Sequence, residues 1–124
     1  MQAGDTFLLS KRDGKKLHLY VIISRTNTKG NVLCVSFSST YPGFTDKACV
    51  IQPGQYDFKF IKRSTFIDYG QAKEIDTTML RINIQGGRWT QGENIPETLL
   101  NKIQNGARKS AFLPHKFRAY FSLF

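Results

Sequence analysis

The first two-thirds of the chain consists of short apolar segments separated by turn signals, and this spacing constrains the fold more than any other feature. The segments are rich in Val, Ile, Leu and Phe, and each is short enough to favour a strand over a helix. Asp13-Gly14, residues 27–31 and Pro53-Gly54 are typical of tight turns. The pattern predicts a small barrel or sandwich. The predicted strands are residues 6–10, 17–24, 32–38, 48–51 and 65–69, with 73–76 as a short continuation or a turn.

The last third changes to helical periodicity. Pro96 suits the first turn of a helix, and Gly106 is expected at its end. The aromatic tail, residues 117–124, is expected to dock on the domain, although a dimer or partner surface is the alternative. At 124 residues, one domain is expected over 1–124, with a β part at about 4–80 and a helical, aromatic part at about 94–124. The apolar helix positions are Ile95, Leu99, Leu100, Ile103 and Ala107.

The charge balance favours polyanionic partners. Eighteen Lys and Arg against nine Asp and Glu give a net charge of +9. Residues 98–124 hold five bases and no acid, and basic and aromatic residues interleave at 59–63 and 116–120. Such stretches suit unpaired bases, although aromatic residues are more often core. Nucleic acid, an acidic protein and an anionic membrane surface are the candidates, and a merely basic surface is the alternative.

Neither the cysteines nor the apolar runs indicate a metal site or a membrane segment. Cys34 and Cys49 each lie in an apolar run and are predicted to be unbonded core thiols, which fits a cytoplasmic location. Their spacing, with that of His18 and His115, matches no metal signature. The run at 19–23 is far too short to span a bilayer, and the N-terminus lacks the pattern of a signal peptide.

Two features could carry chemistry. His18 interrupts the apolar start of a predicted strand, and an imidazole with an unperturbed pKa of about 6.5 can act as acid or base. A structural histidine is the ordinary alternative. Residues 36–40 place hydroxyls at a strand end, where they could bond phosphate oxygens or simply form a turn. The chain contains no nucleophile elbow, P-loop, zinc-protease or dinucleotide fingerprint.

Several of these segments, in order, resemble the PemK/MazF-like toxins of type II toxin–antitoxin systems. The similar pieces are Gly4-Asp5 with the strand after it, residues 18–24, residues 32–39 and residues 64–76. The resemblance implies a mainly β domain with a C-terminal helix, built as a small SH3-like β-barrel. It also implies a cytoplasmic homodimer that cleaves single-stranded RNA without metal or cofactor and is held inactive by an acidic antitoxin.

The resemblance also implies site residues. The family's catalytic Arg and Thr fall at His18 and Ser38, and Leu19 stands where the family has Pro. An imidazole can perform acid–base work, whereas a guanidinium mainly stabilises charge. The expected RNA-binding residues are Lys15, Lys16, Ser39, Lys62, Arg63 and Lys73.

Two other functions fit the same sequence. The barrel could bind nucleic acid or an acidic protein without catalysis, with His18 purely structural; the loss of Arg at the catalytic position favours this alternative. An assembly subunit is supported only by the aromatic C-terminus.

Overall fold

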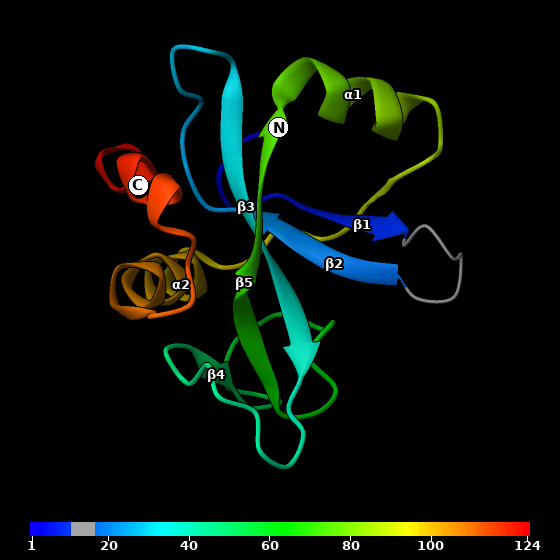
Figure 1. Ribbon diagram of the computed structural model, residues 1–124. Coiled ribbons are helices and arrows are strands. Elements are labelled where there is room, and N and C mark those ends of the chain that lie inside the picture. The colour runs from blue at the N-terminus through cyan, green and yellow to red at the C-terminus, as the bar shows by residue number, and fades with distance from the viewer. Residues whose placement is uncertain (11–16) are drawn as a thin grey trace.

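The computed structural model of the protein describes residues 1–10 and 17–124. The chain forms mainly β structure with helices toward its C-terminal end, as the sequence predicts (Figure 1). The elements are β1 (Thr6–Ser10), β2 (Leu17–Ile22), β3 (Asn31–Ser39), β4 (Val50–Ile51), β5 (Thr65–Asp76), α1 (Thr77–Gln85), β6 (Thr90–Gln91), α2 (Glu97–Lys109) and the 3-10 helix η1 (His115–Leu123).

The strands form one antiparallel sheet in the order β4-β5-β3-β2-β1-β6. Within the described residues this sheet ends at β4 on one side and β6 on the other, so a closed barrel is not confirmed. Two strands are shorter than predicted: β2 ends at Ile22, and β4 contains only Val50 and Ile51.

A long bulge divides β5. Ser36 of β3 pairs with Asp68, but Cys34, two residues earlier, pairs with Lys73. A single residue of β3 is therefore opposed by residues 69–72 of β5. Because extra residues in one strand bend it and increase its twist, the bulge turns the second half of β5 away from the first. The segments predicted at 65–69 and 73–76 are thus two halves of one strand.

Helix α1 was not predicted, although its start carries a local signal. The Asp76 carboxylate accepts hydrogen bonds from the N–H groups of Thr78 (2.8 Å) and Met79 (3.1 Å), which makes Asp76 the N-cap. Only Leu80 and Asn83 of this helix are buried, and Met79 is 53% exposed. With so narrow an apolar face, α1 lacks the helical spacing of apolar residues that makes α2 recognisable in the sequence.

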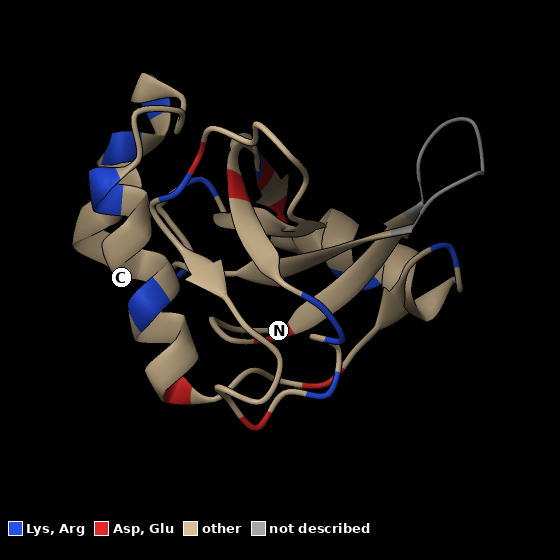
Figure 2. Ribbon diagram, turned by 90° about the horizontal axis from the view of Figure 1, so that it is seen from below, with Lys and Arg blue, Asp and Glu red and all other residues tan. Residues whose placement is uncertain are grey.

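Helix α2 follows Pro96 as predicted but continues three residues beyond Gly106. The expectation that Gly106 ends the helix is wrong, because this glycine has a packing role. A Cβ at this position would lie 3.1 Å from the Cβ of Cys49 and even closer to the Tyr69 hydroxyl. Glycine therefore lets α2 approach the sheet closely. In Figure 2, Lys and Arg positions follow α2 and the segment beyond it.

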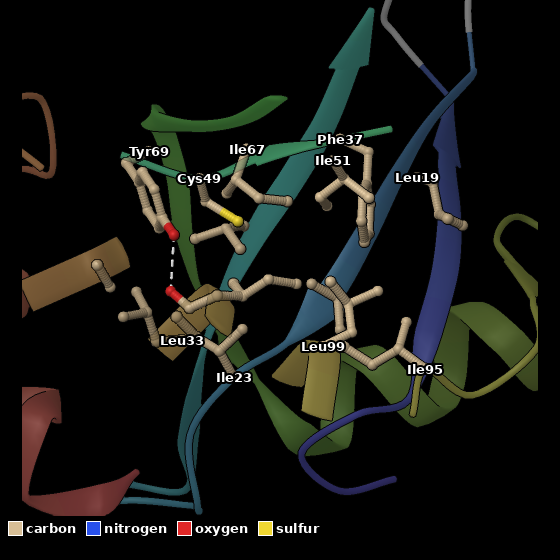
Figure 3. Close-up of a cluster of buried hydrophobic side chains, with 14 of the residues drawn as sticks. Leu19, Ile23, Leu33, Phe37, Cys49, Ile51, Ile67, Tyr69, Ile95 and Leu99 are labelled. Atoms are coloured by element: carbon tan, nitrogen blue, oxygen red, sulfur yellow. Dashed lines mark hydrogen bonds between the residues drawn. The ribbon is translucent and has the colours of Figure 1, made fainter. Parts of the chain in front are cut away.

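The two faces of the sheet bury separate apolar clusters. The larger cluster joins β2, β3 and β5 to α2 and η1, and its interior is shown in Figure 3. There the Tyr69 hydroxyl donates a 2.6 Å hydrogen bond to the Ile103 carbonyl of α2. Phe117 and Tyr120 of η1 belong to this cluster, which confirms that the aromatic tail docks. The smaller cluster includes Phe7 and Leu80.

The thiols of Cys34 and Cys49 are free and buried, as predicted. None of the helices in the described ranges has the length and apolar character needed to cross a bilayer.

Candidate functional site

The registers of three neighbouring strands bring polar side chains together on one sheet face. Tyr20 of β2 pairs with Ser36 of β3, and Ser36 pairs with Asp68 of β5. Continuing the β2–β3 register by two residues would bring His18 opposite Ser38. Since side chains two residues apart in a strand share a face, these five residues project from the same side. The smaller apolar cluster lies on this same side of the sheet, and these five residues extend that face with mostly polar side chains.

His18, Ser38 and Asp68 line one groove of about 590 Å³, here called the strand groove. His18 and Ser38 are both half-buried, and the Nε2 atom of His18 itself lies out of contact with solvent. The structure therefore brings together the two residues that the sequence identifies as catalytic candidates. The full lining is His18, Leu19, Phe37, Ser38, Ser39, Tyr41, Phe60, Lys62, Arg63, Thr65, Phe66 and Asp68.

Three of the six predicted RNA-binding residues, Ser39, Lys62 and Arg63, line this groove and are exposed. Lys73 does not: it lines a different pocket with Trp89 and Lys116, on the far side of the β5 bulge. The predictions for Lys15 and Lys16 fall outside the described residues.

Asp68 is the groove residue that sequence reasoning missed. Burial raises the pKa of its carboxyl above the ordinary value of 3.8, and the nearby Asp46 carboxyl raises it further. The N–H groups of Gly70 and Gln71 and the positive charge of His18 act in the opposite direction. The bulge supplies both N–H groups. A carboxyl so placed is a candidate for proton transfer nearer neutrality than an ordinary aspartate.

Two further polar residues, Tyr20 and Ser36, lie outside the groove lining on the same face of the sheet. Burial raises the pKa of the Tyr20 hydroxyl, although a hydrogen bond with Ser36 lowers it in part. The same hydroxyl donates a 3.4 Å hydrogen bond to the Gln71 carbonyl. Tyr20 and Ser36 are 4% and 1% exposed, so they support the groove and do not meet a ligand directly.

The groove rim combines aromatic rings with cations. Tyr41 is 57% exposed and Phe60 is 44% exposed. Lys62 and Arg63 lie shortly after Phe60, whereas Ile61, which separates them from it, is buried in the core. Exposed rings beside fixed positive charge can stack unpaired bases while the cations neutralise phosphates. The basic and aromatic stretch at 59–63 thus divides its residues between core and rim.

Taken together, the strand groove holds two proton-transfer groups, a hydroxyl and fixed positive charge. The imidazole of His18 and the carboxyl of Asp68 can exchange protons with a ligand. Ser38 can donate a hydrogen bond to an anionic oxygen, and Lys62 and Arg63 can balance its charge. The described residues form no group of three or more His, Cys, Asp and Glu placed to hold a metal ion.

A comparison with models of known protein families finds no match to this chain, and a search of curated proteins finds no significant match.

Proposed function

We propose that this protein is an endoribonuclease that cleaves single-stranded RNA by attack of the ribose 2′-OH, without a metal ion. The observation that carries the proposal is the grouping of His18, Ser38 and Asp68 with Lys62 and Arg63 in one groove. RNA self-cleavage needs a proton acceptor, a proton donor and charge stabilisation at phosphorus, and these residue types supply all three.

The raised pKa of Asp68 and the charge of His18 suggest how the roles divide. The Asp68 carboxylate accepts the 2′-OH proton as the 2′-oxygen forms its bond to phosphorus. The bond from phosphorus to the 5′-oxygen breaks, and the His18 imidazolium protonates the leaving oxygen. Ser38, Lys62 and Arg63 stabilise the charge that develops on the phosphate oxygens. The products are a 2′,3′-cyclic phosphate and a free 5′-OH.

The wider setting of the proposal comes from the family resemblance. We infer a PemK/MazF-like toxin of a type II toxin–antitoxin system, acting in the cytoplasm as a homodimer and inhibited by an acidic antitoxin. The six-stranded antiparallel sheet and the net charge of +9 support this inference, with the sheet interpreted as an SH3-like barrel that the described pairing leaves open.

Cleavage by the purified protein, measured with a chelator present, tests the proposal. Diverse RNAs should be cut, and the products should carry cyclic phosphate ends. His18→Ala should lower the rate about 10²- to 10⁴-fold, the usual contribution of a general acid or base. Added imidazole should restore part of that loss. Intact RNA after incubation with folded protein free of antitoxin would refute the enzyme hypothesis.

The dependence of kcat/KM on pH separates the two proton-transfer roles. The wild type should give a bell-shaped profile, rising as Asp68 ionises and falling as His18 loses its proton. Asp68→Asn should abolish most activity, and whatever remains should lack the acidic limb. Asp57→Asn, which removes an exposed carboxyl outside the groove lining, should keep both limbs. An unchanged acidic limb in Asp68→Asn would assign the base elsewhere.

A non-catalytic RNA-binding module is the second candidate. The exposed rings of Tyr41 and Phe60 beside two cations favour it, because such a rim binds single strands without any chemistry. A salt-sensitive complex with RNA, formed without products at any pH, would support this function over cleavage.

A further inference from the structure

A second groove lies at the C-terminal end of the molecule, here called the C-terminal groove. Its volume is about 490 Å³, and it is formed by the end of α2, the connection to η1 and one side of η1. Arg108, Lys109 and Arg118 line it and are exposed, and no Asp or Glu is among the described residues of its lining. Figure 2 shows Lys and Arg positions at this end of the helical layer.

The five bases of the C-terminal third are not equivalent. Lys102 has a structural role, since its ammonium donates a 2.8 Å hydrogen bond to the Val50 carbonyl of β4. Lys116 lines the pocket that contains Lys73. The remaining three are those of the C-terminal groove. Their charge is therefore concentrated in one concave site, a better anion-binding arrangement than a uniformly basic surface.

One residue from each groove approaches Gly70. A Cβ built on Gly70 would lie 3.5 Å from the Asp68 Oδ1 of the strand groove and 3.8 Å from the carbonyl oxygen of Phe112. Phe112 lines the C-terminal groove and is 47% exposed. An exposed aromatic side chain therefore marks the boundary, with cations in the groove on either side of it.

We propose that the C-terminal groove binds the continuation of the RNA strand whose cleavage site occupies the strand groove. Arg108, Lys109 and Arg118 neutralise its phosphates, and Phe112 stacks an unpaired base at the junction. A base suits the junction better than a phosphate does, because the Asp46 carboxylate, which lies near Asp68 and is hydrogen-bonded to Ser110, would repel a phosphate there. This proposal rests on the proposed function for the identity of the ligand as RNA and for the place of the cleavage site in the strand groove.

Alternating cations and exposed rings favour RNA over an acidic protein segment. Both ligands would satisfy the three cations, but base stacking also explains the exposed Phe112 between the two basic sites. The buried carboxylate of Asp46, which accepts a 3.0 Å hydrogen bond from Ser110 Oγ, does not line the C-terminal groove, and its charge acts on the junction with the strand groove.

Binding measured with uncleavable oligonucleotides tests the proposal separately from catalysis. The probes are fluorescent single strands with 2′-O-methyl riboses, about 4 and about 12 nucleotides long, which approximate one groove and both. Lys109→Ala/Arg118→Ala should weaken the long probe about tenfold at low salt and leave the short probe within about twofold. The matched control Lys29→Ala/Arg88→Ala removes the same net charge from exposed positions outside both linings and should affect the two probes equally.

Two further measurements complete the test. Phe112→Ala should also weaken the long probe about tenfold, as expected when a stacking partner is lost, with little change in the salt dependence. Loss of two phosphate contacts in Lys109→Ala/Arg118→Ala should reduce the slope of log affinity against log salt by about 1.4. Equal losses for the long probe in the groove variant and its control, or equal losses for long and short probes, would overturn the proposal. So would unchanged RNA affinity with weakened binding of polyglutamate, which would assign the groove to an acidic protein.

Discussion

The contact between Gly106 and Tyr69 gives a quantitative test of how α2 is held against the sheet. In Gly106→Ala, the new methyl group would overlap the Tyr69 hydroxyl and approach the Cβ of Cys49 to 3.1 Å. Overpacking costs about 1–3 kcal/mol, and an overlap this deep should cost about 2–3 kcal/mol. Alanine in a helix interior recovers about 1 kcal/mol relative to glycine. The free energy of unfolding should therefore fall by about 1–2 kcal/mol.

Tyr69→Phe removes the atom that causes the worst overlap. Alone, this change loses the buried hydrogen bond to Ile103 and should cost about 1 kcal/mol. In the Tyr69→Phe background, however, Gly106→Ala should cost less than about 0.5 kcal/mol, because the remaining close atoms require a shift of only a few tenths of an ångström. The two changes should thus couple by about 1–2 kcal/mol.

Urea unfolding followed by Trp89 fluorescence and by circular dichroism measures each corner of the cycle. The m-value should stay constant, which shows that the extent of unfolding is unchanged. Tyr41→Phe, which alters an exposed ring far less constrained by packing, is the control and should add to Gly106→Ala without coupling. Additive costs for Tyr69→Phe and Gly106→Ala would refute the conclusion that the Tyr69 hydroxyl leaves no room for a side chain at position 106.

Three other properties can be measured in the same preparation. Asp76→Ala should lower the free energy of unfolding by about 1 kcal/mol in urea titrations, because α1 loses the carboxylate that accepts from Thr78 and Met79; no loss would mean that the cap contributes nothing. Since the pKa of Asp68 is raised in the folded state, folding takes up a proton between pH 3.8 and that raised value, and ionisation of Asp68 should destabilise the protein progressively as pH rises through this window. Asp68→Asn should therefore gain stability relative to wild type across the window in thermal melts, whereas a constant difference would contradict the raised pKa. Burial raises the pKa of Cys49 to about 11 and that of Cys34 further. Neither thiol should therefore react with iodoacetamide near neutral pH until urea unfolds the chain. Rapid labelling of the folded protein, detected by mass spectrometry, would contradict the buried positions.

The elements that sequence analysis found are those with a strong local pattern. Strand β1 was predicted because a short apolar segment ends at a turn signal, and helix α2 because its apolar residues recur at helical spacing. Both signals are visible without tertiary information. Helix α1 was missed because its buried face is only Leu80 and Asn83. The end of α2 was misplaced because the reason for Gly106 lies on another element, at Tyr69.

The candidate site was predictable in part for the same reason. His18 could be singled out because it interrupts an apolar strand start, and Ser38 because the family resemblance places a catalytic Thr at its position. Asp68 could not, since an aspartate in an alternating strand is ordinary until the β3 register and the bulge place it beside the other two. Lys62 and Lys73 are equally basic in sequence, but Lys62 precedes β5 and Lys73 lies beyond its bulge, and they line different pockets.

The β5 bulge also determines which changes of chain length the protein should tolerate. Side chains alternate along a strand, so removing one residue from 69–72 would move Lys73 and Ile75 together to the opposite face and take Ile75 out of the smaller apolar cluster. Removing two residues would preserve that alternation but draw the Gly70 and Gln71 N–H groups away from Asp68. The length of segment 69–72 therefore determines both which way the second half of β5 faces and where the N–H groups near Asp68 lie. Insertions and deletions there should be tolerated less well than at the exposed turn near Pro53 and Gly54.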